Sequence, residues 1–387
     1  MRKSKDASEL ICVVLVIDDL EYGGAQRQVI ELANNIDIEH FNVHICTLSD
    51  YIPLGNQLRD VNVRLHIIKK LNKVDFTVVP RLVKLLKFLN ADIVHSFLFA
   101  SDIASRLAGH FAGTKLIIGS ERNANYSLKI RNKLAYKLTQ KYVDLIIANS
   151  KTGANFNRKI FNQSIEKYRV VYNGVDTERF KPREKPELRK NLKLPVEDKI
   201  IGVFASFKPQ KNHEMLIRAF SKVIVSIPET SLLFVGDQLY GNMNDTGQYH
   251  KKMECLIDEL KIRNHCIFMG NRDDVEMIYP ACDISILSSL YEGTPNVLLE
   301  SMSCGVPVIA TNVCDNSHIV KNGETGYLVD LNDINGMVQS IKKLLANNDL
   351  RQNMGKKARD WLTDEFSVNQ LAKRMENIYL EALSEKL

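Results

Sequence analysis

The sequence lacks the patterns of a disulfide-stabilised, zinc-binding or membrane-spanning protein. Its seven cysteines are scattered, odd in number and never spaced C-x-x-C, which argues against a disulfide framework or a zinc site. The apolar run near the start, LICVVLVI, has only eight residues. It is too short to span a bilayer and more typical of a strand than of a signal peptide. These absences predict reduced, mostly buried thiols in a cytoplasmic protein that is at most peripheral to a membrane.

Three further motifs are missing. The glycine-containing loop DDLEYGGAQRQ has no G-x-G-x-x-G fingerprint, so a dinucleotide cofactor is not expected. No D-x-D triplet follows a strand, and Asp18 and Asp19 alone are too weak a pattern to predict a metal ion. Aromatic residues are not interleaved with basic ones and no nucleic-acid motif occurs, which argues against a nucleic-acid partner.

Length and charge distribution describe a soluble protein with two halves of opposite charge. A chain of 387 residues is too long for one ordinary core, so two domains are expected. Residues 1–173 carry 25 basic and 16 acidic side chains, a balance of +9, and residues 174–387 carry 27 and 30, a balance of −3. The basic half is either a solvated surface or a surface that attracts an anionic membrane or a polyprenyl-phosphate-linked acceptor.

Strand and helix patterns alternate along most of the chain. Residues 10–17 form a near-continuous β-branched run, typical of a central parallel strand covered on both faces. Alternation through residue 175, and again from residue 199 to 365, predicts two α/β domains, each a doubly wound parallel sheet. Residues 176–198, with three prolines and many charges, are predicted to be a linker.

Open α/β sheets bind ligands at the carboxyl ends of their strands, so two such domains facing each other would place two sets of loops across one cleft. The loops that this argument singles out are at Gly23–Gly24, His95, Glu121–Arg122, Asn173–Gly174, Ser206–Lys211, Gly236–Asp237, Gly270–Asp274 and Glu292–Val297.

The most informative stretch is YEGTPNVLLESMSCGVP, residues 291–307, between two strand patterns. Seven residues separate Glu292 from Glu300, and they begin with the turn Gly293, Thr294 and Pro295. Proline suits the start of a helix because its missing N–H costs nothing there.

The helix start predicted in this stretch is suited to a phosphate. Backbone N–H groups of Asn296 and Val297, with the helix dipole, would form an anion site beside Glu292. Glu300 lies about 7 Å farther along the helix, at 1.5 Å per residue, where it could accept hydrogen bonds from a ribose diol. The alternative is two surface glutamates that flank a buried helix.

Three other positions carry weaker signals. Lys208 and Lys211, in the loop SFKPQKN, could neutralise a diphosphate leaving group or belong to an ordinary solvated loop. His95 ends an apolar strand and is either a ligand-facing or a structural histidine. Glu121 and Arg122 end the next strand, where they could brace the cleft, contact an acceptor or form an ion pair within the domain.

Taken together, these motifs resemble those of the retaining glycosyltransferases of glycosyltransferase family four, which have the B-type glycosyltransferase fold of two Rossmann-like domains. The resemblance spans nearly the whole chain, and its most specific part is an E-x7-E motif. The segments that carry it are YGGAQRQ, VVYNGVDTERF, FASFKPQKNHEMLIRAF, FMGNRDDV, SSLYEGTPNVLLESMSCGVPVIATN and GETGYLV.

The resemblance implies a role for each matching residue. Catalytic roles fall to Glu292, at the transferred sugar's hydroxyls, to Lys211, at the donor diphosphate, and to His95, near the reacting sugar. Residues implied in substrate binding are Gly23, Gly24, Lys208, Asn212, Arg272, Gly293, Thr294, Pro295, Asn296, Val297 and Glu300, with Arg272 near the base and Glu300 at the ribose. A final helix, residues 366–387, is expected to pack back on the N-terminal, acceptor-side domain.

Two positions depart from the family pattern. Ser206 stands where an arginine is common, so Lys208 is expected to take over charge neutralisation. Cys314 and Asp315 replace a pair of glycines that normally allow close backbone approach to the diphosphate.

The implied activity is retaining, metal-independent transfer of a sugar from a nucleotide diphosphate sugar, with uridine favoured over guanosine. The expected acceptor is a glycan or lipid-linked oligosaccharide of surface polysaccharide or lipopolysaccharide assembly. The alternatives are a sugar-nucleotide epimerase of the same fold and a non-catalytic sugar-binding protein.

Overall fold

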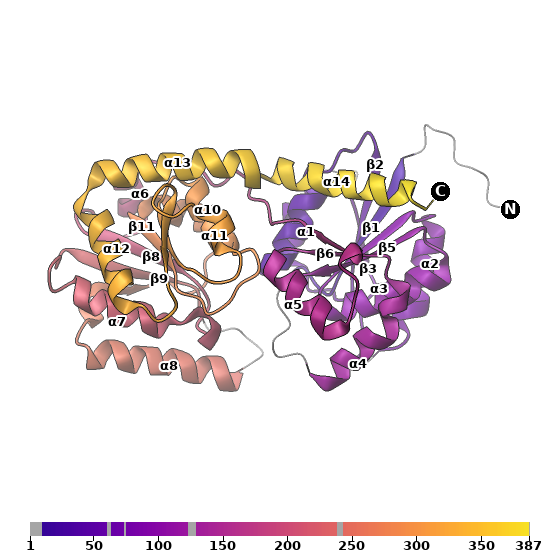
Figure 1. Cartoon of the computed structure of the whole chain (residues 1–387), viewed down its shortest axis with the longest axis horizontal. Helices are drawn as coiled ribbons and strands as arrows, with labels where there is room; N and C mark the ends of the chain where they lie inside the picture. The colour runs from indigo at the N-terminus through magenta and orange to yellow at the C-terminus, as the bar shows by residue number, and fades with distance from the viewer. Residues whose placement is uncertain (1–9, 60–62, 73–74, 123–128, 238–242, 387) are drawn as a thin grey trace. The chain divides into compact units, whose positions relative to one another are not determined.

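The structure, a computed structural model, describes residues 10–59, 63–72, 75–122, 129–237 and 243–386. The chain divides into two compact units, one formed by Met1–Gly174 with Val368–Leu387 and the other by Val175–Ser367. Each unit contains its own parallel β-sheet with helices on both faces (Figure 1). Two Rossmann-like α/β domains are therefore present, as the alternating pattern predicted. Within the described ranges, no helix has both the length and the apolar composition needed to cross a membrane.

A seven-stranded sheet in the order β3-β2-β1-β4-β5-β6-β7 forms the centre of the first unit. Side chains of β1 alternate between its two faces, and those of Val13 to Ile17 are all fully buried. This explains why the strand is an uninterrupted apolar run. The strands are β1 (Ile11–Ile17), β2 (Phe41–Thr47), β3 (Arg64–Ile67), β4 (Ile93–Phe97), β5 (Leu116–Glu121), β6 (Leu145–Ala148) and β7 (Tyr168–Val170).

Helices cover both faces of this sheet. One apolar core joins the sheet to α1 and α14, and a second core on the other face joins it to α2 and α3. The helices are α1 (Gly24–Asn35), α2 (Val78–Phe88), α3 (Phe99–Ala112), α4 (Ile130–Thr139), α5 (Lys151–Phe161) and α14 (Val368–Ser384), with 3-10 turns η1 (Pro53–Gln57), η2 (Gln140–Tyr142) and η3 (Ile165–Lys167).

The second unit repeats this plan with six strands in the order β10-β9-β8-β11-β12-β13. The strands are β8 (Lys199–Phe204), β9 (Thr230–Val235), β10 (Cys266–Phe268), β11 (Ile284–Leu287), β12 (Val308–Thr311) and β13 (Gly326–Val329). In the first sheet β1 lies between β2 and β4, and in the second β8 lies between β9 and β11, so the strand order reverses beside β1 and beside β8. Ligand-binding loops gather at such a point.

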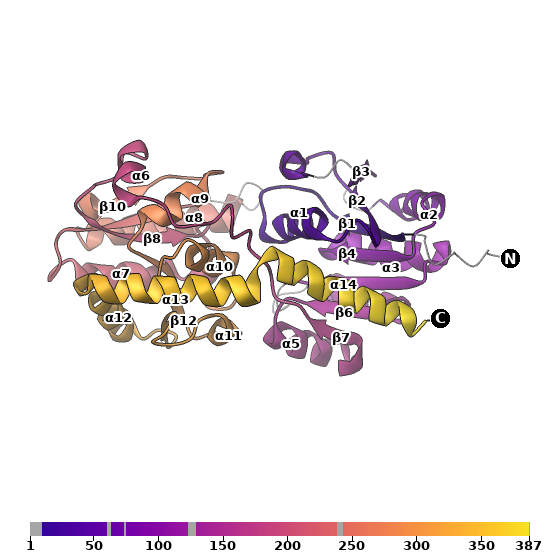
Figure 2. The ribbon, with the colours of Figure 1, turned by 90° about the horizontal axis from the view of Figure 1, so that it is seen from above.

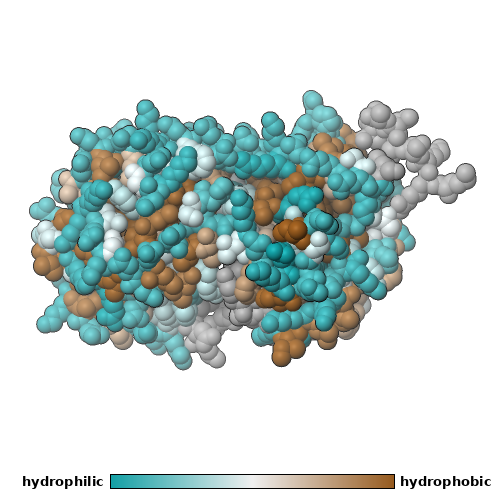
Figure 3. All heavy atoms as spheres, viewed as in Figure 1, coloured by the Kyte–Doolittle hydropathy of each residue, from teal (hydrophilic) through white to brown (hydrophobic). Residues whose placement is uncertain are grey.

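The helices of the second unit also lie on two faces. One core packs α7, α8 and α12 against the sheet, and the outward side of α13 is mostly hydrophilic (Figure 3). The elements are α6 (Lys185–Asn191), α7 (His213–Val223), α8 (Met243–Glu259), α9 (Val275–Ile278), α10 (Asn296–Ser303), α11 (Asn316–Ile319), α12 (Ile334–Ala346) and α13 (Asn348–Phe366), with η4 (Pro209–Lys211), η5 (Arg263–His265) and η6 (Tyr279–Ala281).

Residues 176–198 are not the separate linker that their prolines and charges suggested. Phe180 and Leu188 are buried in the second unit, at 1% and 5% exposure. Arg189, on α6, donates to the Asp283 carboxylate at 2.7 Å and also to backbone carbonyls. The charges of this segment are thus used in specific contacts, which composition alone does not reveal.

The C-terminal helix α14 completes the core of the first unit. It lies along α1 in both views of the ribbon (Figure 2), and its Tyr379 side chain is fully buried among residues of the sheet. The Tyr379 hydroxyl is 2.6 Å from Nδ1 of His95 on β4. The first unit therefore depends on a segment that is nearly two hundred residues away in the sequence.

Replacing Tyr379 with phenylalanine should lower the free energy of unfolding by about 1–3 kcal/mol, because a buried His95 nitrogen would lose its partner. Urea unfolding would measure the loss, with Tyr51→Phe, at a tyrosine that is 56% exposed, as the matched control. Equal stability of the two variants would show that the buried hydrogen bond contributes nothing.

Candidate functional site

An ion pair in the second unit joins the lysine loop to the glutamate stretch. Lys211, at the end of η4, places its Nζ 2.5 Å from Oε1 of Glu292, just before α10. Both side chains are mostly buried, at 15% and 10% exposure. Because the pair is largely removed from water, its attraction is screened less than that of a surface pair.

Backbone contacts hold these two loops together. Gln210 donates from Nε2 to the carbonyl of Tyr291 at 2.8 Å, and its own carbonyl accepts from the N–H of Leu290 at 2.8 Å. Ser288 donates its hydroxyl to the carbonyl of Lys211 at 2.8 Å. Sequence analysis did not single out Gln210 or Ser288, because their partners lie about eighty residues away and no local pattern marks them.

The helix α10 begins at Asn296, with Pro295 as its N-cap residue and no capping hydrogen bond from a side chain. Gly293, Thr294 and Pro295 therefore form the turn that leads into the helix, and Val297 occupies its first turn. The positive end of the helix dipole lies at this turn, three residues after the Glu292 carboxylate.

The second glutamate of the motif is also buried and hydrogen-bonded. Glu300 is 5% exposed, and its Oε2 accepts from the Tyr279 hydroxyl at 2.8 Å. The Tyr279 ring stacks on Phe204 with centroids 3.7 Å apart, at the carboxyl end of β8. Glu300 is thus oriented by the same strand that precedes the lysine loop.

Lys208 lies in the same loop as Lys211 and is partly buried. Desolvation lowers the pKa of the Lys208 ammonium, the nearby charge of Lys211 lowers it further, and Glu292 acts in the opposite direction. Two ammonium groups in one loop with a single close carboxylate form a locally cationic site. Such a site is suited to a diphosphate.

Arg272 and Asn212, both predicted to bind substrate, contact residues other than the Lys211–Glu292 pair. Arg272, in the turn after β10, donates to both carboxylate oxygens of Asp274, at 2.8 and 2.6 Å, and is partly exposed. Asn212 has a left-handed backbone with φ 49° and precedes the first residue of α7. Its side-chain nitrogen is 3.7 Å from the sulfur of Met215.

The backbone of the loop after β9 lies in close contact with the backbone of the loop after β8. Gly236 has φ 125°, and a Cβ there would lie 2.5 Å from the carbonyl oxygen of Ala205. Only glycine fits this position without strain. The close contact fixes the start of the segment from Ser206 to Lys211.

The second departure from the family pattern lies after β12. Cys314 has φ 50°, a left-handed backbone that is uncommon for residues other than glycine. The chain therefore keeps a conformation that glycine adopts more easily, although the residue is cysteine. Asp315 follows as the N-cap residue of the short helix α11.

In the first unit, the glycine pair begins α1 as predicted. Gly23 is the N-cap residue and Gly24 the first helical residue, and neither is buried. One turn later, the amide of Gln28 donates to the carbonyl of Gly174 at 2.8 Å and accepts from its N–H at 2.9 Å. The helix α1 is joined in this way to the segment that follows β7.

His95 occupies an enclosed position on β4. It is fully buried, with Nδ1 2.6 Å from the Tyr379 hydroxyl and Nε2 2.6 Å from the Ser120 hydroxyl. Desolvation lowers the pKa of the His95 imidazole to about 3, so the ring is neutral near pH 7. Both nitrogens are occupied, and in this arrangement the ring has a packing role. Its predicted catalytic role stays a prediction.

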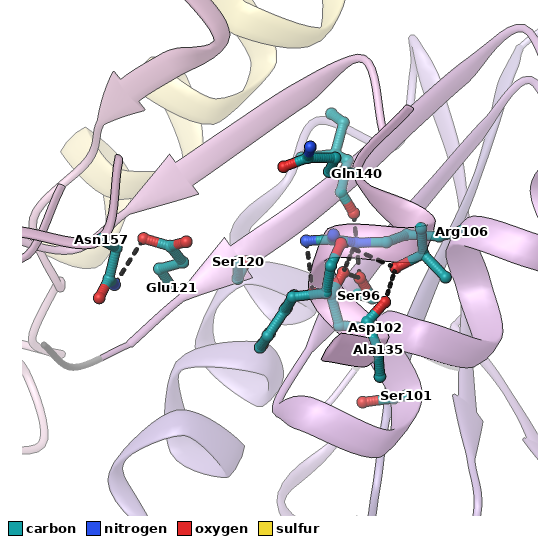
Figure 4. Close-up of polar contacts among 12 residues, drawn as sticks. Ser96, Ser101, Asp102, Arg106, Ser120, Glu121, Ala135, Gln140 and Asn157 are labelled. Atoms are coloured by element: carbon teal, nitrogen blue, oxygen red, sulfur yellow. Dashed lines mark hydrogen bonds and ion pairs between the residues drawn. The ribbon is translucent and has the colours of Figure 1, made fainter. Parts of the chain in front are cut away.

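Glu121 and Arg122, adjacent at the end of β5, face different surroundings. The Glu121 carboxylate accepts from Asn157 Nδ2 at 2.6 Å and from the Tyr168 hydroxyl at 3.1 Å. Figure 4 shows Glu121 turned towards Asn157 on α5. Burial raises the pKa of Glu121 to about 7, although both hydrogen bonds act in the opposite direction. Arg122 instead donates from Nη2 to the side chain of Asn173.

Glu121 should make stability depend on pH. Its carboxyl group holds a proton to about pH 7 in the folded state but loses it near pH 4.5 when unfolded, so stability falls as the pH rises through this window. A neutral Gln at position 121 can accept from Asn157 and donate to the Tyr168 hydroxyl. Glu121→Gln should therefore show a smaller decrease in Tm from pH 5 to pH 8 than the wild type.

The control for this experiment is Glu39→Gln, at an exposed carboxylate of the same unit. It should follow the wild-type pH profile, because its side chain is exposed and the substitution leaves the buried Glu121 carboxyl group in place. Parallel profiles for all three proteins would contradict the role assigned to the buried carboxyl group.

Among the described residues, no group of three or more histidine, cysteine, aspartate or glutamate side chains is arranged to hold a metal ion. The polar groups that gather at the carboxyl edges of the two sheets are instead amides, ammonium groups and paired carboxylates. Their chemistry fits the binding of sugars and phosphates.

Comparison with known proteins agrees with this chemistry. Residues 22–179 match the family model "Glycosyltransferase Family 4", and residues 184–361 match "Glycosyl transferases group 1". The two matches together cover most of the chain, and each falls largely within one of the two units.

Relatives of full length have low sequence identity. The chain is 25% identical to N-acetyl-alpha-D-glucosaminyl L-malate synthase of Bacillus anthracis over 84% of each chain. It is 26% identical to UDP-Gal:alpha-D-GlcNAc-diphosphoundecaprenol alpha-1,3-galactosyltransferase of Escherichia coli over 94% of this chain and 95% of that one. The crystal structure of Anabaena HepE in complex with UDP superposes with a TM-score of 0.83 at 19% identity, covering 96% of this chain and all of that one.

Both halves of the chain match models of the same enzyme class, and its two parallel-sheet units have the fold of the solved relatives. The protein therefore belongs to glycosyltransferase family four, and it is a hexosyltransferase with the B-type glycosyltransferase fold.

Proposed function

We propose that this enzyme transfers a hexose from a UDP-sugar, with retention of anomeric configuration, to a hydroxyl group of a glycan or lipid-linked acceptor. The reaction would serve surface polysaccharide or lipopolysaccharide assembly. The observation that carries the proposal is the buried Lys211–Glu292 pair at the start of α10, with Lys208 beside it.

The choice of donor rests on two relatives. HepE is described in complex with UDP, and the Escherichia coli galactosyltransferase has UDP-Gal in its name. In this chain, Glu300 is a buried carboxylate fixed by Tyr279, and a carboxylate in that position can accept both hydroxyl groups of a ribose. A uridine nucleotide is the donor that fits these observations.

Donor binding would replace one ion pair with another. The diphosphate is a stronger anion than a single carboxylate, so it would take over the Lys211 ammonium, with Lys208 and the N–H groups at the start of α10 as further donors. Glu292, released from Lys211, could then accept hydrogen bonds from hydroxyl groups of the sugar. The closed Lys211–Glu292 pair would keep both groups oriented until the donor arrives.

In the chemical step, negative charge develops on the leaving diphosphate. The bond between the anomeric carbon and the diphosphate oxygen breaks as a bond forms from the acceptor oxygen on the same face of the sugar. The acceptor proton passes to the departing phosphate oxygen. Lys211 and Lys208 stabilise the negative charge that develops on the leaving group, which is the interaction expected to strengthen in the transition state.

The surface of α4 supports contact with an anionic membrane. Its exposed face carries Ile130, Leu134 and Leu138, spaced four residues apart and 86%, 56% and 64% exposed. The helix contains no acidic residue, and the exposed cations in and next to it are Lys129, Arg131, Lys133, Lys137 and Lys141. In Figure 3, hydrophobic and hydrophilic side chains alternate at the edge where Figure 1 places α4.

A helix with this combination binds at a lipid interface, where apolar side chains insert and cations meet anionic head groups. The sequence predicts a long basic helix over residues 126–142, and residues 123–128 lie outside the described ranges. A lipid-linked acceptor would give the enzyme a reason to be at such an interface. The diphosphoundecaprenol acceptor in the name of the Escherichia coli relative is of this kind.

Replacing Lys211 with alanine should lower kcat by about 10²–10³, as loss of a transition-state charge contact does, and should weaken UDP binding. Glu292→Ala should lower sugar transfer but retain UDP binding, because Glu292 is assigned to the sugar. Transfer assays with a panel of UDP- and GDP-sugars, together with calorimetry of UDP, would measure both effects.

Lys222→Ala, at an exposed lysine of α7, is the control and should behave as the wild type. Full activity of both Lys211→Ala and Glu292→Ala would refute the site. Inversion of the product's anomeric configuration, seen by NMR, would refute the proposed stereochemistry.

Replacing Ile130, Leu134 and Leu138 with serine should abolish most binding to vesicles that contain anionic phospholipid, since the apolar contact is lost. Co-sedimentation at low and high salt would measure it, and wild-type binding should decrease with salt. Phe88→Ser, at an 80% exposed residue of α2, should bind as the wild type. Equal binding of all three proteins would exclude α4 as the membrane contact.

A further inference from the structure

The guanidinium of Arg122 is a cation without an anionic partner among the residues that the structure describes. Its Nη2 donates to the amide oxygen of Asn173, and its Nε is enclosed without any acceptor. The nearest aromatic ring is that of Phe97, 5.9 Å from the guanidinium carbon. An amide and a ring face do not neutralise a positive charge.

Other buried arginines of this chain are compensated. Arg106, in the same unit, pairs with Asp102 at 2.8 Å, and both are 1% exposed (Figure 4). Arg189 pairs with Asp283 at 2.7 Å. Arg351 donates to two backbone carbonyls and an amide oxygen. Among the described residues, Arg122 lacks the carboxylate partner that Arg106 and Arg189 have, and it makes one hydrogen bond where Arg351, which also has no carboxylate, makes three.

An uncompensated charge of this kind is costly to the folded protein. Desolvation lowers the pKa of Arg122 to about 10, and the group still remains charged at neutral pH. Glu121, its neighbour in sequence, could have paired with it but bonds to Asn157 and Tyr168 instead. Within the described part of the chain, Arg122 is therefore left without a carboxylate.

The position of Arg122 defines what could reach it. The residue follows the last residue of β5, at the carboxyl edge of the first sheet, and its side chain is partly exposed. Asn173, which holds the guanidinium, is followed by Gly174, which is hydrogen-bonded to Gln28 of α1. Arg122 thus belongs to the same edge as the Gly23–Gly24 turn.

We propose that Arg122 binds an oxyanion of the acceptor substrate, a phosphate, diphosphate or carboxylate group, with Asn173 as the residue that positions the guanidinium. The proposal rests on the glycosyl transfer proposed above and on the acceptor-side role that the family resemblance implies for the N-terminal domain. A planar guanidinium suits such groups because it can donate two parallel hydrogen bonds to them. Acceptors of two relatives, L-malate and a diphosphoundecaprenol-linked sugar, carry groups of this class.

The test titrates inorganic pyrophosphate into the full-length protein saturated with UDP, which fills the donor site of the second unit. Arg122→Gln should raise the pyrophosphate Kd at least tenfold. Arg122→Lys should have an intermediate effect, because lysine keeps the charge but cannot donate two parallel hydrogen bonds. UDP affinity should be unchanged in both variants. Arg64→Gln, at an exposed arginine of β3 in the same unit, should leave both affinities unchanged.

Thermal stability separates a ligand-binding role from a structural one. Loss of an uncompensated charge should leave the Tm of Arg122→Gln equal to that of the wild type or higher, whereas loss of a structural arginine would lower it. A lower Tm with unchanged pyrophosphate affinity would overturn the proposal. So would the absence of pyrophosphate binding to the UDP-saturated wild type.

Failure of the proposed donor can be told apart from failure of this inference. If the wild type does not bind UDP, the donor assignment is wrong, and the same titration in the Lys211→Ala background still tests Arg122. A parallel titration with malate distinguishes the source of the oxyanion. Preference for pyrophosphate indicates a phosphorylated acceptor and preference for malate a carboxylate, and in either case Arg122→Gln must weaken binding.

Discussion

The 2.5 Å contact between Lys211 and Glu292 is the interaction on which the proposed donor-side chemistry depends. It connects a loop after β8 with the turn before α10, and the backbone bonds of Gln210 and Ser288 hold both loops in place. A lysine without that carboxylate would be a mobile side chain in solvent. Paired and half-buried, it is oriented where a diphosphate can replace the carboxylate at little cost in side-chain entropy.

Buried charged groups of the first unit are compensated in two ways. Asp102 and Arg106 neutralise each other in the interior, and Glu121 is kept partly protonated by burial. Arg122 has neither kind of compensation. Unfavourable electrostatics of this sort persist where a ligand removes them, and the contrast within a single unit is stronger evidence than the arginine by itself.

Much of the site was predictable because it follows from local sequence. The E-x7-E spacing, the proline before Asn296 and the two lysines after β8 are short patterns whose geometry a helix start or a tight loop determines. His95 shows what local reasoning leaves open. A histidine at the end of a strand could be ligand-facing or structural, and in the folded unit Tyr379, from the far end of the chain, and Ser120 contact its two ring nitrogens. The prediction of a linker over residues 176–198 missed a contact of the same kind. Arg189 and Asp283 are far apart in the sequence and meet only in the folded unit.

The sequence by itself determined the two α/β units, the family and the helix start that follows Glu292, because hydrophobic periodicity and short motifs are local properties. The tertiary structure decided which charges are neutralised. Glu121 and Arg122 are adjacent in the chain and equivalent in any pattern, but successive side chains on a strand point to opposite faces. Among the described residues, one therefore bonds to Asn157 and Tyr168, and the other donates to the amide of Asn173. Contacts with distant segments gave the two residues different surroundings, and the role proposed for Arg122 rests on this difference.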